Sequence, residues 1–224
     1  MTVRRIRSPA SPDARPLLRG WIHAAAAPAA LAAVVVLICR APTVPALVSA
    51  VAFAVCAVTL FAVSALYHLG AWPPRVRAVL RSVDHADILF LIAGTYTPFA
   101  VLVLRGDARV AVLCVVWTAA TLGAVFRVAW TGLPRWVYVA LYLCLGWVAV
   151  PVLPQLLRGA SSSALVLVVT GGVMYTLGGV VYGLKRPDPW PRVFGFHEIF
   201  HAFTVAAFTC QYVAVWLVIR AAGW

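Results

Sequence analysis

Residues 46–68 read ALVSAVAFAVCAVTLFAVSALYH, a run of 23 residues without a formally charged side chain. A helix needs about 20 apolar residues to cross the hydrocarbon core of a bilayer, so this stretch is long enough to span a membrane. Six other apolar stretches meet or nearly meet that length, and clusters of Pro, Gly and Arg separate them. The seven predicted spans are residues 21–39, 46–68, 86–104, 110–126, 136–153, 164–184 and 194–219.

The composition of the whole chain agrees with this pattern. Of its 224 residues, 64% are apolar and 11% are charged, and the mean hydropathy is +0.97. Soluble domains are about half apolar and about a quarter charged, so both a soluble globule and a disordered protein are excluded. The chain also lacks the alternating ten-residue segments typical of an outer-membrane barrel. We therefore predict an all-α integral membrane protein, a seven-transmembrane helix bundle.

The basic residues predict how the bundle is oriented. The formal net charge is +12, but Lys and Arg lie between the apolar runs, as juxtamembrane charges do, so we expect no nucleic-acid partner. Thirteen of the 18 fall on the side of the N-terminus, which predicts a cytoplasmic N-terminus and a C-terminus outside. The thirteen are Arg4, Arg5, Arg7, Arg15, Arg19, Arg75, Arg77, Arg81, Arg127, Arg135, Lys185, Arg186 and Arg192, and the five are Arg40, Arg105, Arg109, Arg158 and Arg220.

Two regions follow from the spans. Residues 1–20 are predicted to be a basic cytoplasmic segment, and residues 21–224 the seven-helix transmembrane domain. Basic residues before an alanine-rich run also resemble a signal peptide, but the charged region is long, so we expect residues 21–39 to remain as the first helix. The sixth span carries five glycines that predict a small-residue surface for close helix packing: Gly171, Gly172, Gly178, Gly179 and Gly183.

The polar residues inside the spans gather on the predicted cytoplasmic side. Ionisable groups at membrane depth are costly and usually functional. His197 and His201 are four residues apart, so on a helix both imidazoles share one face, a spacing that suits two ligands of one metal ion. Ser64 and His68 have the same spacing on the second span. Three imidazoles at similar depth, with the carboxylate of Asp84 nearby, predict a catalytic zinc site with one open position.

Plainer interpretations exist for several of these residues. His23 and His85 are predicted at helix ends, where an isolated histidine usually lies at the membrane interface. His85 could instead contact one of the metal ligands without binding the metal itself. Asp87 is expected in the first turn of the third span, where the helix dipole favours an acid. His197 to His201 also match H-E-x-x-H, in which Glu198 would be the general base of a metalloprotease. The chain has no Leu-Asp-Gly segment of the sort that supplies the third metal ligand in site-2 proteases. His68 offers a better third ligand.

Four motifs are specific in combination: Ser64-Ala-Leu-Tyr-His68, Asp84-His85, residues 92–98 (IAGTYTP) and residues 196–201 (FHEIFH). Together they resemble the hemolysin III family, the bacterial relatives of the progestin and adiponectin receptors. The resemblance covers nearly the whole chain from Arg19 onward. It implies seven helices, a cytoplasmic N-terminus and a zinc ion in the inner leaflet.

The resemblance also implies roles for single residues. The three zinc ligands of the family fall on His68, His197 and His201. The helix-3 aspartate, which contacts water beside the zinc, falls on Asp84, and the serine one turn before the helix-2 histidine falls on Ser64.

Two positions qualify the resemblance. Gln211 is a departure, because many bacterial members carry His there, and we expect the change to leave the zinc site undisturbed. Glu198 occurs in bacterial members but not generally in the eukaryotic receptors, which argues against an essential base.

These observations favour a zinc-dependent hydrolase that acts on a lipid amide or ester inside the bilayer. Asp84 would accept a proton from water, and Ser64 would hydrogen-bond the developing oxyanion or the water. The wider superfamily that the chain resembles includes alkaline ceramidases, so the expected partner is a membrane lipid with a long acyl chain. The expected location is the plasma membrane, the inner membrane of the cell, as a multi-pass protein.

Two other hypotheses belong to different classes. Zinc could pin helices together in a non-catalytic, receptor-like regulator of membrane state. The family name implies a cytolysin, although nothing in seven tightly packed apolar helices suggests a secreted pore.

Overall fold

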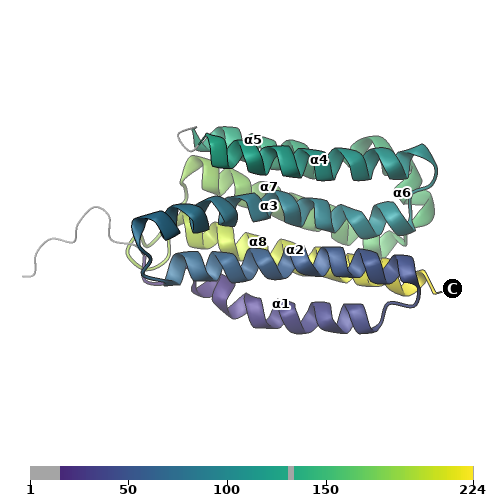
Figure 1. Ribbon diagram of the computed structural model, residues 1–224, viewed down its shortest axis with the longest axis horizontal. Helices are drawn as coiled ribbons and strands as arrows, with labels where there is room; N and C mark the ends of the chain where they lie inside the picture. The colour runs from purple at the N-terminus through teal and green to yellow at the C-terminus, as the bar shows by residue number, and fades with distance from the viewer. Residues whose placement is uncertain (1–15, 131–133, 224) are drawn as a thin grey trace, which may run out of the picture.

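The computed structural model describes residues 16–130 and 134–223, which form an elongated bundle of nearly parallel and antiparallel helices (Figure 1). Seven segments are long and apolar enough to cross a membrane, and the described residues contain no β-strand. The all-α fold and the seven spans are thereby confirmed. The helices are α1 Trp21–Cys39, α2 Val44–Leu69, α3 Pro74–Leu102, α4 Asp107–Ala129, α5 Arg135–Gly146, α6 Leu153–Gly159, α7 Ser162–Leu184 and α8 Phe196–Ala221.

Helix α3 begins twelve residues earlier than predicted, at Pro74 rather than residue 86. Proline is favoured in the first turn of a helix, because its fixed φ suits that turn and its missing N–H loses no bond there. The residues that follow are largely exposed and include three arginines, so an apolar window did not register them. Asp84 and Asp87 consequently lie in the third and fourth turns. The interpretation of Asp87 as a first-turn acid is therefore wrong.

The fifth span is interrupted. Helix α5 ends at Gly146, and one turn of 3₁₀ helix over Val150–Val152 leads into the short α6. Pro151 and Pro154 cannot donate the backbone hydrogen bonds that would continue an α-helix from α5. The whole segment Arg135–Gly159 still has the length and hydropathy of one span, which ends six residues later than predicted.

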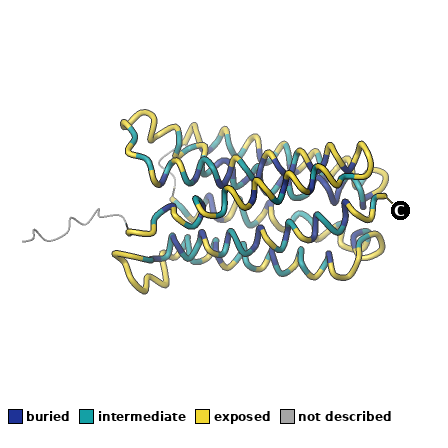
Figure 2. Tube along the Cα trace, turned by 90° about the horizontal axis from the view of Figure 1, so that it is seen from below, coloured by how far each residue is buried: buried dark blue, intermediate teal, exposed yellow. Residues whose placement is uncertain are grey.

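Helix α3 is central to the packing. It contacts α2, α4, α5 and α8, while α1 packs against α2 and α8, and α7 packs against α5 and α8. Buried positions follow the inward faces of the helices along the length of the bundle (Figure 2). Glycines allow the closest approach, as predicted: a Cβ on Gly171 would meet the backbone oxygen of Ala207 on α8 at 3.1 Å.

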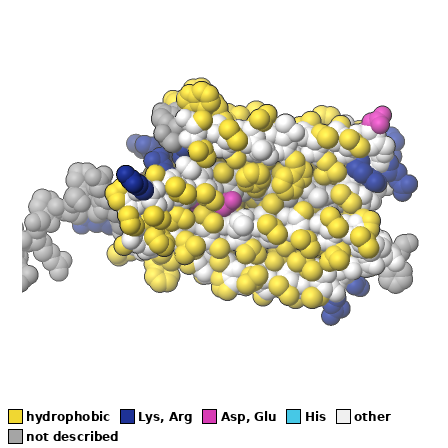
Figure 3. All heavy atoms as spheres, in the orientation of Figure 1, with side chains coloured by type: hydrophobic (Ala, Val, Ile, Leu, Met, Phe, Trp, Pro, Cys, Tyr) yellow, Lys and Arg dark blue, Asp and Glu magenta, His cyan; other side chains and the backbone are white. Residues whose placement is uncertain are grey.

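The outer surface is that of a membrane protein. Apolar side chains cover most of the face in Figure 3, and basic side chains gather at its two ends. Thirteen Lys and Arg were predicted for the cytoplasmic side. Nine of them lie in the described part of the chain, from Arg19 to Arg192, and the order of the helices places all nine at the same end of the bundle. The other four, Arg4, Arg5, Arg7 and Arg15, lie outside the described residues, as does most of the predicted basic segment 1–20. The cytoplasmic N-terminus remains a prediction.

The last residues before α1 lie against the loop that precedes α8. Backbone N–H groups of Leu17 and Leu18 donate to the carbonyls of Arg192 and Val193, at 3.0 and 3.1 Å. The start of the described chain is thereby held beside the first turn of α8.

Candidate metal centre

Three histidines from opposite halves of the chain meet at one end of the bundle. His68 lies in the last turn of α2, and His197 and His201 lie in the first two turns of α8. The start of α8 is fixed by two carboxylates. Asp188 accepts the N–H of Phe196 at 3.0 Å, and Glu198 accepts the N–H of Gly195 at 2.8 Å. These bonds satisfy N–H groups that have no partner within the helix and so set where α8 begins.

The imidazoles face a common point. Nε2 of His68 lies 3.2 Å from Nε2 of His197, and one ligand nitrogen from each of the three rings lies within 4.8 Å of the others. Two nitrogens bound to a tetrahedral ion at about 2.0–2.1 Å stand roughly 3.3 Å apart, so this pair already has the separation that a shared ion requires. The three histidines could hold a metal ion, as predicted for His68, His197 and His201.

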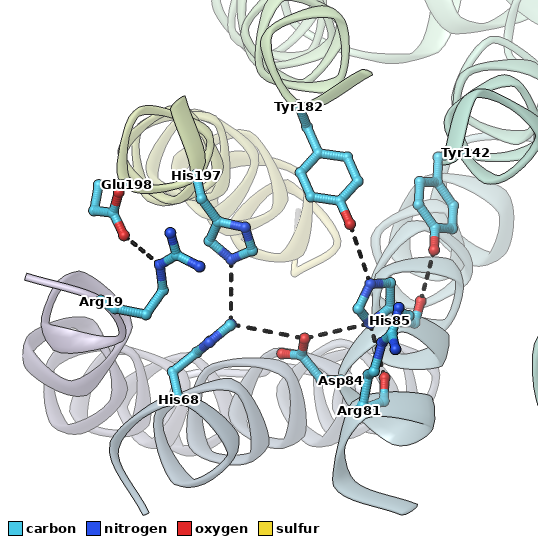
Figure 4. A network of polar contacts seen from close by, with 9 residues as sticks. All are labelled: Arg19, His68, Arg81, Asp84, His85, Tyr142, Tyr182, His197 and Glu198. Atoms are coloured by element: carbon cyan, nitrogen blue, oxygen red, sulfur yellow. Dashed lines mark hydrogen bonds and ion pairs between the residues drawn. The ribbon is translucent and has the colours of Figure 1, made fainter. Parts of the chain in front are cut away.

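Asp84 and Ser64 lie beside the three imidazoles. The carboxylate of Asp84 approaches Nε2 of His68 at 3.9 Å and Nδ1 of His85 at 3.5 Å (Figure 4). Ser64 is buried on α2 and lines the same small cavity as Asp84. Because α3 begins at Pro74, Asp84 reaches this depth from the third turn of the helix rather than from its first residue.

A small cavity joins these groups. It has a volume of about 20 Å³, and its lining includes Ser64, Asp84, His197 and His201. A cavity of that size holds about one water molecule. Two of the three candidate metal ligands, His197 and His201, and the two predicted catalytic residues therefore line a space that suits a single small guest.

Comparison with known proteins identifies the family. A family model described as haemolysin-III related matches residues 14–212, which is most of the chain. The chain belongs to the haemolysin-III-related family. It is 27% identical to Hemolysin-3 of Bacillus cereus over 86% of both chains. It is 29% identical to a Hemolysin-3 homolog of Bacillus subtilis, over 75% of this chain and 76% of the relative.

A plant relative extends the similarity beyond bacteria. The haemolysin-III-related chain is 33% identical to the heptahelical transmembrane protein ADIPOR2 of Oryza sativa subsp. japonica, over 73% of this chain and 78% of the relative. The word heptahelical in that name agrees with the seven membrane-length segments found here. The resemblance inferred from the four sequence motifs is confirmed, and the protein is a multi-pass membrane protein.

His23 differs from its predicted place at the interface. In this haemolysin-III-related chain it is 3% exposed, and its ring stacks on that of His201, with centroids 3.8 Å apart and planes 3° apart. The ring of Phe61 also packs against that of His23 in a T-shaped contact, with centroids 5.1 Å apart. His23 also lines the small cavity, so the interfacial interpretation is wrong. Its position in α1 gave no sign of this, because the stack depends on how α1 packs against α8.

Glu198 does not face the metal ligands. Its carboxylate accepts a hydrogen bond from Nε of Arg19 and one from the backbone of Gly195, and the residue is 1% exposed (Figure 4). It is absent from the lining of the small cavity. Both carboxylate oxygens of Glu198 therefore accept hydrogen bonds at the start of α8. In this H-E-x-x-H sequence the glutamate stabilises the start of the helix and is not placed as the general base of a metalloprotease would be.

Aromatic residues near Asp84 were missed by the sequence reasoning. Nε2 of His85 is hydrogen-bonded to the hydroxyl of Tyr182 at 3.2 Å, and the backbone carbonyl of His85 accepts a hydrogen bond from the hydroxyl of Tyr142 at 3.1 Å (Figure 4). Nδ1 of His85 lies 2.7 Å from the carbonyl of Arg81. These contacts hold the imidazole of His85 against Asp84, so His85 belongs to the site and is not merely interfacial.

A second, larger cavity adjoins the first. It has a volume of about 550 Å³, lies among α3, α5, α6, α7 and α8, and is lined mainly by apolar side chains. Four residues line both cavities: Leu60, Ile88, Phe200 and Thr204. The large cavity also includes Trp147, Val150 and Val166, which are 46–64% exposed, so it reaches the outer surface between the α5–α6 segment and α7.

Proposed function

We propose that the protein is a zinc-dependent intramembrane hydrolase that cleaves a lipid amide or ester. The observation that carries this proposal is the adjoining pair of cavities, one beside the three histidines and one apolar and large. A metal site alone would suit many functions. A metal site that adjoins a space for hydrocarbon suits a lipid whose carbonyl group sits at the metal and whose chain extends away from it.

Zinc suits the donor set. Three imidazole nitrogens with no thiolate are a common ligand set for catalytic zinc, which leaves a fourth position for water or substrate. Bound zinc supplies a Lewis acid and lowers the pKa of a water molecule to about 7. His68, His197 and His201 would each present one neutral ring nitrogen to the ion.

Asp84 and Ser64 would act on the reacting groups. The carboxylate of Asp84 would accept a proton from water and pass it to the leaving nitrogen or oxygen, which is general acid–base catalysis. The Ser64 hydroxyl, in the lining of the small cavity beside Asp84, would donate to the carbonyl oxygen as negative charge develops on it. His85, held by Tyr182 and by the backbone of Arg81, would keep the carboxylate in position.

The large cavity would receive the acyl chain. About 550 Å³ lies within the range of typical ligand pockets, which is about 300–1,000 Å³, and its apolar lining favours hydrocarbon over water. Its opening between the α5–α6 segment and α7 would admit a lipid sideways from the bilayer. The proposed location is the plasma membrane, with the metal site near the cytoplasmic leaflet and residues 1–20 and 21–224 as the cytoplasmic segment and the membrane domain.

A non-catalytic regulator is the competing function. A structural zinc site usually closes all four positions with protein ligands. Asp84 is not part of the group of three histidines that could hold a metal ion, and its carboxylate lies 3.9 Å from Nε2 of His68. This geometry favours an open fourth position and hence the hydrolase.

The test compares the wild type with Asp84→Asn in detergent. Both purified proteins are incubated with acyl-amide and acyl-ester lipids, and the fatty acid released is measured beside the metal content. We expect release by the wild type and a loss of at least about 100-fold in Asp84→Asn at unchanged metal content. Equal release by both proteins, or none by the wild type, would refute the hydrolase and leave the regulator.

A further inference from the structure

The ring of His23 lies flat against the ring of His201. Their centroids are 3.8 Å apart, their planes differ by 3°, and both residues are buried. His23 lies in the first turn of α1 and His201 lies on α8, so the stack joins the first helix of the chain to the last. Such a contact resists rotation of either ring, because a turned ring would strike its neighbour.

Two parallel stacked rings cannot share one metal ion. An imidazole binds a metal through a lone pair in the plane of its ring, so an ion held by two imidazoles must lie close to both planes. The planes of His23 and His201 are nearly parallel and do not meet near the site. The rings of the three candidate ligands are inclined to one another by 55–77°, so their planes do intersect. His23 therefore stands beside the coordination sphere and not within it.

His201 lacks the usual support of a metal-binding imidazole. The ring nitrogen that does not bind the metal is normally held by a hydrogen bond, which sets the orientation of the ring. Within residues 16–130 and 134–223, the ring of His201 makes no such bond, and its contacts are to other rings. Of these rings, only that of His23 lies parallel to it. The plane of the His201 ring is therefore set mainly by His23.

The start of α1 is itself fixed against α2 and α8, which keeps His23 in place. Gly20 has a φ of 86°, and a Cβ there would come within 2.6 Å of Cβ of His68, so only glycine fits this close approach. The preceding residue, Arg19, pairs with Glu198 in the first turn of α8. The first turn of α1 is thereby held between the two helices that carry the candidate metal ligands.

We propose that His23 is a positioning residue of the metal centre, which orients the His201 ring by stacking on it. This inference rests on the zinc site of the proposed function, but it does not require hydrolysis. The flat face of the His23 ring does the positioning, and its nitrogens are not needed for it. Helix α1, which contacts only α2 and α8 closely, thereby contributes to zinc binding without supplying a ligand.

Three substitutions of His23 separate the flat ring from its nitrogens and from its volume. His23→Phe keeps a flat ring without nitrogens, His23→Leu fills the space without a flat face, and His23→Ala does neither. Zinc affinity of the full chain in detergent is measured by competition with a chelator. We expect a loss of about tenfold to 100-fold in the Ala and Leu variants, the range for residues that orient a metal ligand. The Phe variant should stay within about threefold of the wild type.

Cobalt(II) in place of zinc gives a second readout, which a general loss of stability does not move. Its visible spectrum reports coordination geometry, so His23→Phe should keep the wild-type spectrum, whereas His23→Ala and His23→Leu should change it. Leu37→Ala is the matched control, because Leu37 is also buried on α1 but lies fourteen residues further along, about 21 Å of helix. It should lower the unfolding temperature and leave zinc affinity and the cobalt spectrum unchanged.

The outcomes separate the positioning role from the zinc site itself. Wild-type zinc affinity in all three His23 variants would overturn the positioning role alone. An equal loss in all three would overturn it too, because it would show that a ring nitrogen of His23 is required. A loss of zinc affinity in Leu37→Ala as large as that in His23→Ala would reduce the effect to general stability. A wild type that binds no zinc would overturn the zinc site of the proposed function, and this inference with it.

Discussion

Nε2 of His68 lies 3.2 Å from Nε2 of His197, although 129 positions separate the two residues. Helices α1 and α3 each pack against both α2 and α8, so the two imidazoles meet in a space enclosed by four helices. His23 from α1 and Asp84 from α3 complete the walls of that space. The candidate metal centre therefore depends on the packing of the bundle as a whole.

Ser64 gives a prediction about catalysis. Ser64 lines the small cavity together with Asp84, so Ser64→Ala should lower kcat about 100-fold to 1,000-fold through the loss of one donor to the developing oxyanion. The measurement is release of fatty acid under saturating substrate. Ser49→Ala is the matched control, because Ser49 is also buried on α2 but donates to the carbonyls of Pro45 and Ala46. A similar loss in both variants would deny Ser64 a specific role.

Glu198 gives a prediction of the opposite kind. Its carboxylate is bonded to Arg19 and to the backbone of Gly195 and does not line the small cavity. Glu198→Gln should therefore keep the metal and keep fatty-acid release within a few-fold of the wild type, while lowering thermal stability because the bond to Arg19 is weakened. Metal content, turnover and unfolding temperature are measured on the same preparation. Loss of turnover at full metal content would restore Glu198 as the general base.

Gly171 gives a prediction about packing. A Cβ there would meet the amide of Gln211 at 2.7 Å and the backbone oxygen of Ala207 at 3.1 Å, whereas a Cβ on Gly172 would meet nothing within 4 Å. Gly171→Val should therefore destabilise the bundle by about 1–3 kcal/mol, since α7 must move away from α8. Gly172→Val is the control and should stay close to the wild type in thermal unfolding. Equal stability of the two variants would contradict the close approach of these helices.

The predicted orientation can be tested by labelling. In a background with the native cysteines replaced by alanine, Arg192→Cys in the loop before α8 should react with an impermeant thiol reagent only from the cytoplasmic side. Arg105→Cys, in the loop after α3, should react only from outside. Both positions are exposed. Labelling with the reverse pattern would show that the excess of Lys and Arg at one end does not set the topology of this chain.

Hydropathy sufficed for the number of spans but not for their boundaries. Lipid requires long apolar runs, so all seven segments stand out in the sequence. The first turns of α3, between Pro74 and Asp84, carry three arginines, so an apolar window misses them. Asp87 was assigned to the wrong turn for that reason. The break before Pro151 was missed because prolines within a long apolar run lower its mean hydropathy too little to divide it, and Arg135–Gly159 still has a mean hydropathy of 2.0.

The convergence of the three candidate metal ligands was predictable, whereas much of their surroundings was not. The i and i+4 spacing of His197 and His201 follows from helix geometry, and His68 was added because it lies at a similar depth with Ser64 one turn before it. The stack of His23 on His201 and the contact of Tyr182 with His85 depend on the rotation of α1 and α7 about their axes. An apolar face that meets lipid and one that meets protein have similar compositions, so the sequence leaves those rotations undetermined.

The most direct test of the account is the metal content of detergent-purified protein. The wild type should carry about one zinc ion per chain, which His68→Ala and His197→Ala should each lose, because a site with two remaining imidazoles binds zinc weakly. His85→Ala, which removes a nearby imidazole outside the metal-binding group, should retain the ion. A wild type without bound metal, or a His68→Ala variant with as much metal as the wild type, would contradict the convergence of α2 and α8 on a single ion.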